Sequence, residues 1–355
     1  MSYFTVKLKD LSLIKTGKLD SNEAVSGGTY PFFTCDPNTL RINNWAYDTE
    51  AVLLAGNNAS GNYTAKYYNG KFNAYQRVYI IETADRSRLN TRYLCYAMNQ
   101  QLQLLKTMSS GSTTKFLTLG MLHGLDIPLP AIADQDKIVS VLSVYDDLIE
   151  NNQKQIKLLE EAAQRLYKEW FIDLRFPGHE TTPIVDGIPQ GWENASVTDL
   201  LEIRYGKDHK GLADGCIPVY GSGGIMRKVD KILYSGESVL IPRKGSLNNI
   251  LLVSGDFWTI DTMFYSVPKR PNVAKYVYLY LTGIDMYAMN IGAAVPSMTV
   301  KILDGMRLLC PSDSILELFE TTAKPYYELL KKKQSMLGET RDRLLPKLMS
   351  GEIEA

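Results

Sequence analysis

The feature that most constrains the fold is an internal repeat. "VKLKDLSLIKTGK" aligns with "ASVTDLLEIRYGK" at an offset of 189 residues, so that Gly17-Lys18 match Gly206-Lys207. Three more blocks follow in the same order: "YPFF" faces "IPVY" and "EAVLLAG" faces "ESVLIPRKG" at offset 187, and "GSTTKFLTLGMLHGLDIPLP" faces "GAAVPSMTVKILDGMRLLCP" at offset 181. Chance can supply one such block, whereas four in one order indicate a duplication. We therefore expect two copies of one structural unit.

Each copy has the same internal order. About 130 residues of short β-branched and aromatic runs, such as "AVLLAG", "RVYII", "SVLIP" and "MFYSV", alternate with Gly and Asn clusters and predict the strands of a mixed α/β (α+β) globule. Local helices are expected at "TRYLCYAMNQQLQLL" and at "AKYVYLYLTG". With 355 residues and a hydrophobic fraction of 45%, each copy is long enough to bury its own core.

A long helix is predicted to follow each globule. The first begins near Asp134, and its apolar positions alternate in steps of four and three for more than four heptads. A single amphipathic helix packed on a globular core is the alternative, but so long and narrow a stripe favours a coiled coil. Asn152 is the only strongly polar member and can fix the register of a pairing. The predicted seam is Ile138, Leu142, Tyr145, Ile149, Asn152, Ile156, Leu159, Ala163, Leu166 and Trp170.

The second long helix, from about Asp313 to Met349, has a less regular pattern. Pro325 lacks a backbone donor and is expected to kink the helix or to start its regular part. About 36 residues make a rod roughly 54 Å long, and the nearest partner for one seam is the other seam of the same chain. Lys333 falls where the repeat places Asn152. The predicted pairing positions are Phe319, Tyr326, Leu330, Lys333, Leu337 and Leu344.

The stretch between the two copies is expected to be a linker. Its turn-forming pieces, which interrupt helix and strand alike, are Pro177-Gly178, Pro183, Asp186-Gly187 and Pro189 with Gly191. The expected picture is two globules held apart by a paired rod, with approximate two-fold symmetry. The predicted segments are a first globule at 1–130, a first long helix at 131–175, a linker at 176–193, a second globule at 194–311 and a second long helix at 312–355.

The formal net charge of zero hides a division of charge along the chain. Residues 1–130 hold 13 Lys and Arg against 9 Asp and Glu, and residues 181–311 hold 13 against 12, so the globules are positive. Residues 131–180 hold 6 against 10 and residues 312–355 hold 7 against 8, so the helices are negative. A polyanion such as DNA is expected to meet the globules and to leave the helices free for protein contacts.

The sequence carries no recognisable catalytic signature. "GNNASGN" has the spacing of a phosphate loop, but Asn62 stands where the loop needs a Lys. The three histidines are expected at the surface, and the cysteines lie far apart without CxxC or Cys-His spacing, which argues against a metal site. These residues are His123, His179 and His209, and Cys35, Cys95, Cys216 and Cys310. We therefore expect a chain that is not an enzyme.

The location of the chain is predicted to be cytoplasmic. No apolar run approaches the ~20 residues of a membrane span. The N-terminus "MSYFTVKLKD" lacks the apolar core of a signal peptide. Scattered cysteines are typical of the reduced cytosol.

Two polar loops, "LLAGNNASGNYTAKYYNGKF" and "IPRKGSLNNIL", follow matching strands of the two copies. Asn and Arg side chains can pair with adenine and guanine edges, and Lys and Ser side chains can reach phosphates. "MSSGSTTKF" and "YGSGGIMRKVDK" add similar groups, and ordinary hydrophilic loops are the alternative. The candidate DNA contacts are Asn57, Asn58, Ser60, Asn62, Lys66, Arg77, Ser112, Lys115, Arg227, Lys228, Arg243, Lys244, Ser246, Asn248 and Asn249.

Together these features resemble the specificity subunit of bacterial type I restriction–modification systems, along nearly the whole chain. The resemblance rests on "IPLPAIADQDKIVSVLSVYDDLIENN" after the first globule, on "WFIDLRFPGHE" and "DGIPQGWE" in the linker, and on "RDRLLPKLMSGEIEA" at the end. It implies that each globule is a target-recognition domain that reads one half of a split DNA site. It also implies that the long helices form an antiparallel rod that sets the distance between the halves.

The resemblance further implies partners. The long helices would dock two methyltransferase (M) subunits, and the full complex would add two restriction (R) subunits. Catalysis, with S-adenosylmethionine, ATP and Mg²⁺, would lie in those partners, with no cofactor in this chain. Because the loops of the two copies differ, the double-stranded DNA target is expected to be asymmetric. The alternatives are a free-standing DNA-binding regulator and an enzyme with an unrecognised site.

Overall fold

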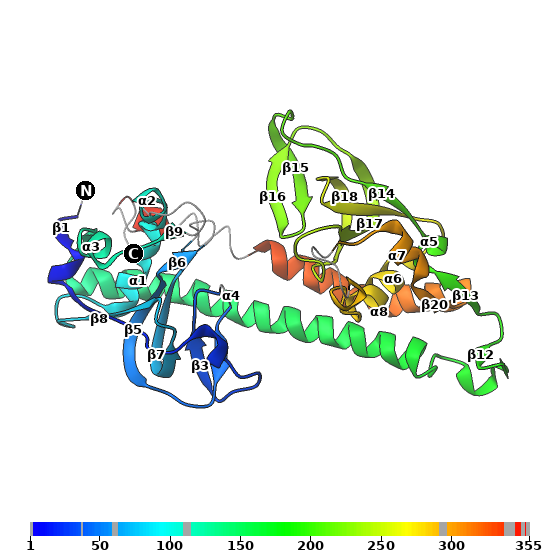
Figure 1. Cartoon of the computed structure of the whole chain (residues 1–355), viewed down its shortest axis with the longest axis horizontal. Coiled ribbons are helices and arrows are strands. Elements are labelled where there is room, and N and C mark those ends of the chain that lie inside the picture. The colour runs from blue at the N-terminus through cyan, green and yellow to red at the C-terminus, as the bar shows by residue number, and fades with distance from the viewer. Residues whose placement is uncertain are drawn as a thin grey trace. The chain divides into compact units, whose positions relative to one another are not determined.

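The structure is a computed structural model that describes residues 3–36, 38–58, 63–108, 115–290, 297–336, 345–348 and 352. Its contacts divide the chain into two compact units. Unit 1 comprises Met1–Asn152 and Ser335–Ala355, and unit 2 comprises Gln153–Gln334. Each unit therefore contains one predicted globule together with part of the long-helix segments (Figure 1).

Each unit is built on one six-stranded sheet, and the two sheets have matching strand orders. In unit 1 the order is β2 (Ser12–Thr16), β8 (Val78–Thr83), β5 (Tyr47–Ala55), β7 (Ala65–Ala74), β3 (Tyr30–Phe33) and β4 (Leu40–Ile42). In unit 2 it is β14 (Leu201–Tyr205), β19 (Met263–Pro268), β17 (Tyr234–Pro242), β18 (Leu251–Thr259), β15 (Asp214–Gly221) and β16 (Gly224–Val229). A parallel pair occupies the same place in both sheets, β3 with β7 and β15 with β18. The topology thus confirms the predicted duplication.

The matching strands β5 and β17 show why the sequence pattern gives this sheet. Both leave their first four residues partly open to solvent and bury the last five, "AVLLA" and "SVLIP". Successive side chains of a strand point to opposite faces, so a run of five buried residues requires cover on both faces. These strands therefore lie inside their sheets, each with two strand neighbours.

Short elements complete each unit in corresponding pairs. β1 (Thr5–Lys7) pairs with β10 (Asp126–Pro128), and β13 (Glu193–Ser196) pairs with β20 (Arg307–Cys310). The predicted local helices are present as α1 (Thr91–Gln100) with α2 (Leu102–Met108), and as α6 (Val273–Thr282). The remaining short elements are η1 (Leu8–Asp10), η2 (Ser21–Glu23), β6 (Asn57–Asn58), β9 (Lys115–Phe116), α3 (Leu119–His123), α5 (Val197–Leu200), η5 (Ala288–Asn290) and α7 (Val300–Gly305).

The matched Gly-Lys dipeptides of the repeat have a steric cause. A Cβ atom on Gly17 would lie 2.2 Å from the carbonyl oxygen of Ala74, and one on Gly206 would lie 2.0 Å from the carbonyl oxygen of Ile260. Atoms cannot approach so closely, so only glycine allows the backbone to pass at this point. Both copies keep it because both make the same close approach.

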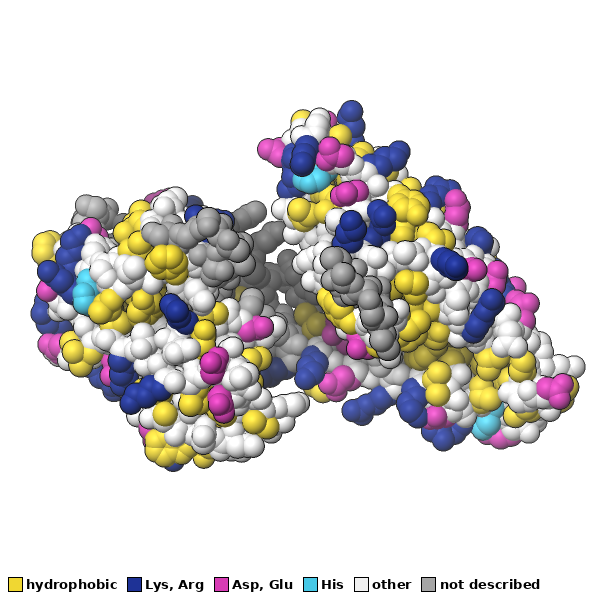
Figure 2. All heavy atoms as spheres, viewed as in Figure 1, with side chains coloured by type: hydrophobic (Ala, Val, Ile, Leu, Met, Phe, Trp, Pro, Cys, Tyr) yellow, Lys and Arg dark blue, Asp and Glu magenta, His cyan; other side chains and the backbone are white. Residues whose placement is uncertain are grey.

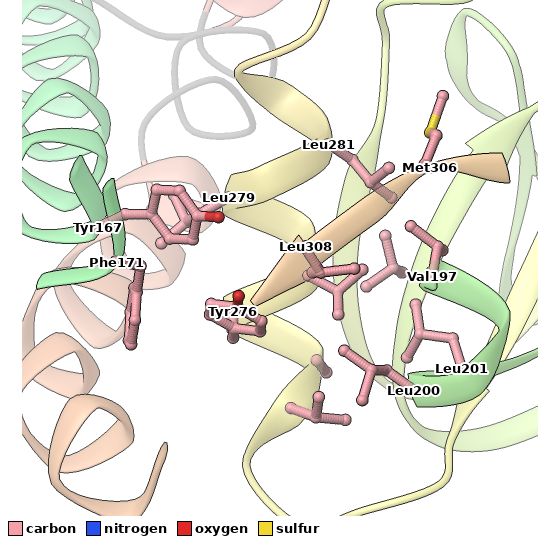
Figure 3. Close-up of a cluster of buried hydrophobic side chains, with 14 of the residues drawn as sticks. Tyr167, Phe171, Val197, Leu200, Leu201, Tyr276, Leu279, Leu281, Met306 and Leu308 are labelled. Atoms are coloured by element: carbon pink, nitrogen blue, oxygen red, sulfur yellow. The ribbon is translucent and has the colours of Figure 1, made fainter. Parts of the chain in front are cut away.

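The core of unit 2 joins the globule to the helices that belong to it. Figure 3 shows Tyr167 and Phe171 beside α6, where the Phe171 ring centroid lies 4.8 Å from that of Tyr276. The Phe171 ring also lies 4.8 Å from the Phe319 ring. Because aromatic side chains bury large areas, these contacts fix the ends of the long helices on the globule.

The first long helix, α4 (Ile132–Tyr167), begins two residues before the predicted start. It continues into a π-helical turn, Lys168–Ile172. In this wider turn both Trp170 and Phe171 are buried, although they are consecutive in sequence. The turn therefore lets two neighbouring aromatic side chains enter one core.

Every predicted seam position in α4 and in the turn that follows it is buried or half-buried. Ile138, Leu142, Ala163 and Trp170 are buried, and the other predicted seam positions are half-buried. In unit 1, Ile138 and Leu142 share a core with Leu348, against which Leu345 also packs. The seam pattern thus describes the packed side of α4.

In unit 2, α4 packs against α8 (Asp313–Met336) in the antiparallel sense. The Trp170 and Phe319 rings lie 5.7 Å apart. Glu160, ten residues earlier in α4, lines a cavity together with Tyr327 and Leu330, which come later in α8. The two helices therefore run in opposite directions.

The structure excludes one of the two alternatives predicted for Pro325 in the second helix. α8 begins at Asp313 and contains Pro325, so Pro325 does not start the regular part of the helix. Pro325 is exposed, so its ring meets solvent rather than the core. Tyr326 is half-buried and Leu330 is buried, and their role in helix pairing stays a prediction. Leu337, Leu344 and the side chain of Lys333 lie outside the described residues.

The predicted linker is packed onto unit 2. Phe176 and Trp192 are buried, with ring centroids 4.9 Å apart. Between them lie η4 (His179–Thr181) and a hairpin of β11 (Ile184–Val185) and β12 (Ile188–Pro189). Its two turn residues, Asp186 at φ 51° and Gly187 at φ 79°, are both left-handed, as a two-residue hairpin turn of type I′ requires.

Within the described part of the chain, no helix is both long enough and apolar enough to cross a membrane.

Candidate nucleic-acid interface

The two polar loops leave equivalent positions of the two sheets. After β5, the backbone N–H of Gly56 donates to the carbonyl of Arg77 at 2.7 Å. After β17, the N–H of Arg243 donates to the carbonyl of Thr262 at 2.8 Å. Gly56 and Arg243 therefore correspond in the repeat, although one has no side chain and the other has the largest cationic one.

The side chain of Arg243 is held inside unit 2. Its guanidinium carbon lies 4.7 Å from the ring centroid of Tyr205 and 5.1 Å from that of Phe264. Nη1 donates to the carbonyl of Asp261 at 2.6 Å. Stacking on two aromatic rings is a favourable site for a planar cation. Arg243, predicted as a base reader, thus anchors the start of its loop.

Asn248 and Asn249 also use their side chains within unit 2. Asn248 Nδ2 donates to Asp285 Oδ1 at 3.0 Å, and Asn248 Oδ1 accepts from the N–H of Met286 at 2.8 Å. Asn249 Nδ2 donates to the carbonyl of Ser222 at 2.8 Å. These bonds tie the far end of the loop to two neighbouring segments. Base reading by the two amides stays a prediction.

The middle of this loop presents two candidate residues to solvent. Lys244 and Ser246 are exposed, whereas Leu247 is fully buried beneath them. Tyr287 Oη donates to the carbonyl of Gly245 at 2.8 Å and accepts from the N–H of Leu247 at 3.2 Å. The loop is therefore a fixed platform from which Lys244 and Ser246 project.

β16 carries two further candidates with different surroundings. Arg227 Nη2 donates to the carbonyl of Leu212 and to Asp214 Oδ1, both at 2.9 Å. Lys228, the next residue, is exposed. Figure 2 shows Lys and Arg side chains on the visible face of unit 2, interspersed with Asp and Glu. Of the two candidates, Lys228 is the more accessible to a ligand.

In unit 1 the described candidates surround the start of the first loop. Cys35 Sγ donates to Asn57 Oδ1 at 2.5 Å, and burial raises the pKa of the Cys35 thiol, so that it keeps its proton. Lys66 Nζ donates to Thr39 Oγ1 at 3.3 Å. Burial lowers the pKa of Lys66, although the nearby carboxylate of Asp36 opposes this shift. Cys35, which follows β3, and Thr39, which precedes β4, thus hold the side chains of Asn57 and Lys66.

Arg77 and Lys115 lie beside the same loop. Arg77 is exposed, and it lines a cavity of about 340 Å³ together with Gly56 and Tyr79. Lys115 is half-buried in β9, which pairs with β6. The side chain of Asn58, and all of Ser60, Asn62 and Ser112, lie outside the described residues.

Comparison with known proteins finds similarity to one family. Residues 2–161 match the family described as "Type I restriction modification DNA specificity domain". The chain is 36% identical over 161 residues to the type I restriction enzyme EcoDI specificity subunit of Escherichia coli, covering 45% of this chain and 35% of that subunit. It is 28% identical over 296 residues to the MjaIX specificity subunit of Methanocaldococcus jannaschii, covering 74% of this chain and 68% of that subunit.

The chain is thus similar to type I specificity subunits, and residues 2–161 carry the match to their DNA specificity domain. Its fold also resembles the crystal structure of a type I restriction–modification S subunit from M. genitalium, with a TM-score of 0.56 and 17% identity over 98% of this chain and 96% of that one. The architecture predicted from the repeat is therefore that of the specificity-subunit fold.

Two ion-pair networks in this specificity-subunit fold were not predicted from the sequence. In unit 1, Arg92 of α1 lies 3.6 Å from Asp146 and 3.5 Å from Asp147, both on α4. The Arg92 guanidinium lies 5.4 Å from the Tyr67 ring centroid, and Tyr67 Oη donates to Glu50 at 2.8 Å. Burial, followed by that hydrogen bond, raises the pKa of Tyr67 to about 12, so its hydroxyl stays protonated.

In unit 2, Lys275 of α6 takes the corresponding role. Lys275 Nζ lies 2.6 Å from Glu237 on β17 and 2.7 Å from Glu320 on α8. Burial lowers the pKa of Lys275, but the hydrogen bonds to the two carboxylates outweigh it, and the pKa lies above its ordinary value. A basic residue in the first turn of an otherwise apolar helix, present in both copies, is the sequence signal for these networks.

No group of three or more His, Cys, Asp or Glu side chains in the described ranges is placed to hold a metal ion.

Proposed function

We propose that this chain is the DNA-recognition subunit of a type I restriction–modification complex, with one unit for each half of a bipartite, asymmetric target. The supporting observation is a duplicated frame with different side chains at equivalent loop positions. Gly56 corresponds to Arg243, and the next residues are Asn57 and Lys244. Two equal frames with unequal contact surfaces are suited to two different half-sites, because base-edge contacts carry the sequence information.

The exposed polar groups favour a nucleic-acid ligand. Lys228, Lys244 and Ser246 in unit 2 and Arg77 in unit 1 are exposed. Lysine side chains neutralise phosphates, whereas an arginine side chain can donate two hydrogen bonds to the edge of one guanine. We assign Arg243 a supporting role, because its guanidinium group is stacked and bonded within unit 2.

The long helices are proposed to dock the partners. Val144, Leu148 and Leu158 of α4 are 55%, 43% and 63% exposed, and Leu329 of α8 is 46% exposed. Large apolar side chains open to solvent on helices are typical of protein contact surfaces. We propose two methyltransferase subunits on these helices, with restriction subunits in the full complex. Catalysis and its cofactors, S-adenosylmethionine, ATP and Mg²⁺, would then belong to the partners and this chain would be non-catalytic.

Methylation mapping of the source strain with and without this gene tests the proposal. We expect one bipartite, asymmetric motif to lose its methylation on deletion and to regain it on complementation. In a strain that expresses a chain with Lys244→Ala and Ser246→Ala, the motif should stay the same but be methylated less completely, because a lost phosphate contact weakens binding to all sequences alike. Methylation that is unchanged by deletion would contradict the proposed function.

A free-standing DNA-binding regulator is the alternative function. Co-expression with the neighbouring methyltransferase gene separates the two. We expect a complex of two methyltransferase subunits with one copy of this chain, and its loss on replacing Leu148 and Leu158 with Asp. A chain that binds DNA specifically but purifies without methyltransferase would favour the regulator.

A further inference from the structure

A cavity in unit 1 occupies the place that a side chain fills in unit 2. The carbonyl of Gly56 accepts from the N–H of Leu117 at 2.8 Å, and the carbonyl of Arg243 accepts from the N–H of Met298 at 2.9 Å. Together with the matching N–H bonds at these residues, this places Gly56 and Arg243 at one position of the repeat. The two surroundings can therefore be compared residue by residue.

The walls of the two sites correspond. Thr16 pairs with Tyr79 across β2 and β8, as Tyr205 pairs with Phe264 across β14 and β19. In unit 2 the Arg243 guanidinium fills this place, stacked on both rings. In unit 1 a cavity of about 340 Å³ remains, lined by Thr16, Gly56, Gln76, Arg77, Tyr79 and Leu117.

The chain cannot fill this cavity from position 56. A Cβ atom on Gly56 would lie 2.6 Å from the carbonyl oxygen of Arg77 and 2.9 Å from Cε2 of Tyr79. Tyr79 cannot readily swing aside, because its Oη donates to the carbonyl of Leu117 at 2.9 Å. The close packing that excludes a side chain thus keeps the space open.

The lining selects a planar, hydrogen-bonding group. Tyr79 offers a fixed aromatic ring, and Gln76 and Thr16 are exposed polar residues. Arg77 supplies a cation that can pair with the acceptor edge of guanine, and among the described residues no Asp or Glu lines the cavity. Unit 2 provides a precedent, since the same place there holds a planar guanidinium group.

Resting on the proposed function, we propose that the cavity of unit 1 receives one nucleobase of the DNA target, turned out of the helical stack. A base inside a duplex cannot enter a cavity of this kind, so it must be extruded, at the cost of its stacking and pairing. Unit 2 does not extrude a base, because Arg243 already fills the corresponding place. Base extrusion is therefore confined to one half-site.

The test uses the full chain in complex with its methyltransferase subunits and duplexes that carry the mapped target. In each duplex one base is removed, position by position outside the methylated bases, to leave its partner unpaired. An unpaired base is cheaper to extrude, so binding at one position should tighten roughly tenfold or more. That position should lie in one half-site only.

Thr16→Tyr supplies the matched variant, because Tyr205 is the natural residue at the corresponding place and position 16 is exposed. We expect it to abolish the tightening, whereas Leu13→Tyr, on the same strand and 64% exposed in the wild type, should preserve it. No tightening at any position, tightening in both half-sites, or tightening that survives Thr16→Tyr would overturn the proposal. A wild-type complex that does not bind the mapped duplex would instead overturn the proposed function.

Discussion

Units 1 and 2 share a backbone frame but hold it together with different side chains. In unit 1, Arg92 is 25% exposed at its side chain and meets its carboxylates at 3.5 and 3.6 Å. In unit 2, Lys275 is 11% exposed and meets Glu237 and Glu320 at 2.6 and 2.7 Å. The connection between globule and long helix thus has longer ion-pair distances and a more exposed cation in unit 1 than in unit 2.

The difference shows which parts of a duplicated fold are free to diverge. The strand order and the glycine beside the sheet are kept because every buried backbone group needs its partner and its space. The polar contacts at the rim can change, since several pairs of opposite charge make the same connection. Stability and recognition are therefore expected to differ between the units although the topology does not.

The largest loss of stability is expected from removing a buried aromatic ring from the core of unit 2. Phe319 is fully buried and corresponds in the repeat to Ile138, which is buried in unit 1. Phe319→Ala should lower the free energy of unfolding by about 3–5 kcal/mol, because it removes transfer energy and leaves a cavity. Urea unfolding of the full chain measures this. Leu318→Ala, at a 41% exposed position of the same helix, is the control and should change little.

Ile138→Ala sharpens this comparison from the other unit. It removes fewer contacts than Phe319→Ala, and about 2–5 kcal/mol is expected for its loss. Because each residue belongs to a separate core, the two losses should appear in different unfolding steps. If Leu318→Ala destabilises the chain as much as Phe319→Ala, the packing described for α8 is wrong.

The next effect separates the two ion-pair networks. Lys275→Met leaves the carboxylates of Glu237 and Glu320 partly buried without their cation, and a loss of about 3 kcal/mol is expected. Arg92→Met should cost about 1 kcal/mol or less, because that pair is longer and wetter. Lys324→Met, at an exposed lysine 3.8 Å from Glu328, is the control. Equal losses for Arg92→Met and Lys275→Met would remove the distinction between the units.

The pH dependence of the Lys275 network has a definite sign. The folded pKa of Lys275 lies above its ordinary value, so folding favours the charged form. Its contribution is full below the ordinary lysine pKa and is lost only as the pH rises through the raised value. The difference in stability between wild type and Lys275→Met should therefore be present at neutral pH and shrink in strongly alkaline solution.

A smaller effect concerns a helix cap that unit 2 has and unit 1 lacks. Ser196 and Asp199 form a capping box, in which the Ser196 N–H donates to Asp199 Oδ2 at 2.7 Å and the Asp199 N–H donates to Ser196 Oγ at 3.1 Å. Lys7, at the matching place, makes no side-chain cap. Ser196→Ala should lower the free energy of unfolding by about 1 kcal/mol, because it removes the cap. Lys7→Ala removes no side-chain cap.

The cap also predicts an acid-sensitive difference. Hydrogen bonds from the backbone and then from the side chain of Ser196 lower the pKa of Asp199. Stability from this carboxylate is thus present above its ordinary pKa and is lost as the pH falls through the lowered value. Urea unfolding at neutral and acid pH should show the effect of Ser196→Ala shrinking in acid. An effect that grows in acid would contradict the capping geometry.

The frame could be predicted from the sequence because its signals are local or repeated. Gly17 and Gly206 mark the same close approach, and the seam from Ile138 to Trp170 repeats at helical spacing. The packing of α4, the local helices and the duplication follow from such patterns. The strand order could not be derived, because β17 pairs with β18 and β19 through contacts that no local pattern encodes.

The positions of the loops could be predicted from the sequence, but the contacts of their side chains within each unit could not. Arg243 looked like a base reader from its composition and position, yet its partner Tyr205 lies 38 residues away in sequence. Asn248 is bonded to Asp285 for the same non-local reason. Only tertiary structure separates an arginine that stacks within the domain from a lysine, such as Lys244, that projects from it.

The smallest effect is expected from exchanging the residues at one corresponding position of the two loops. Lys244 and Asn57 directly follow Arg243 and Gly56, so they correspond in the repeat. Lys244 is exposed, whereas the Asn57 amide accepts a bond from Cys35. If Lys244 contacts a phosphate, Lys244→Asn should reduce the slope of log affinity against log salt concentration by about 0.9. Asn57→Lys should increase it by a similar amount if the new lysine reaches a phosphate.

The DNA sequence preference of the two variants shows whether the exchanged side chains contact phosphates or bases. A phosphate contact weakens binding to all sequences alike, so the methylated motif should stay the same in both variants. Lys301→Ala, at an exposed lysine of α7 outside the candidate set, is the control and should leave the slope unchanged. A slope that also falls for Lys301→Ala would show that net charge, and not the loop, carries the effect. A changed motif in Lys244→Asn would make Lys244 a base reader, and the two loops would then differ in specificity as well as in affinity.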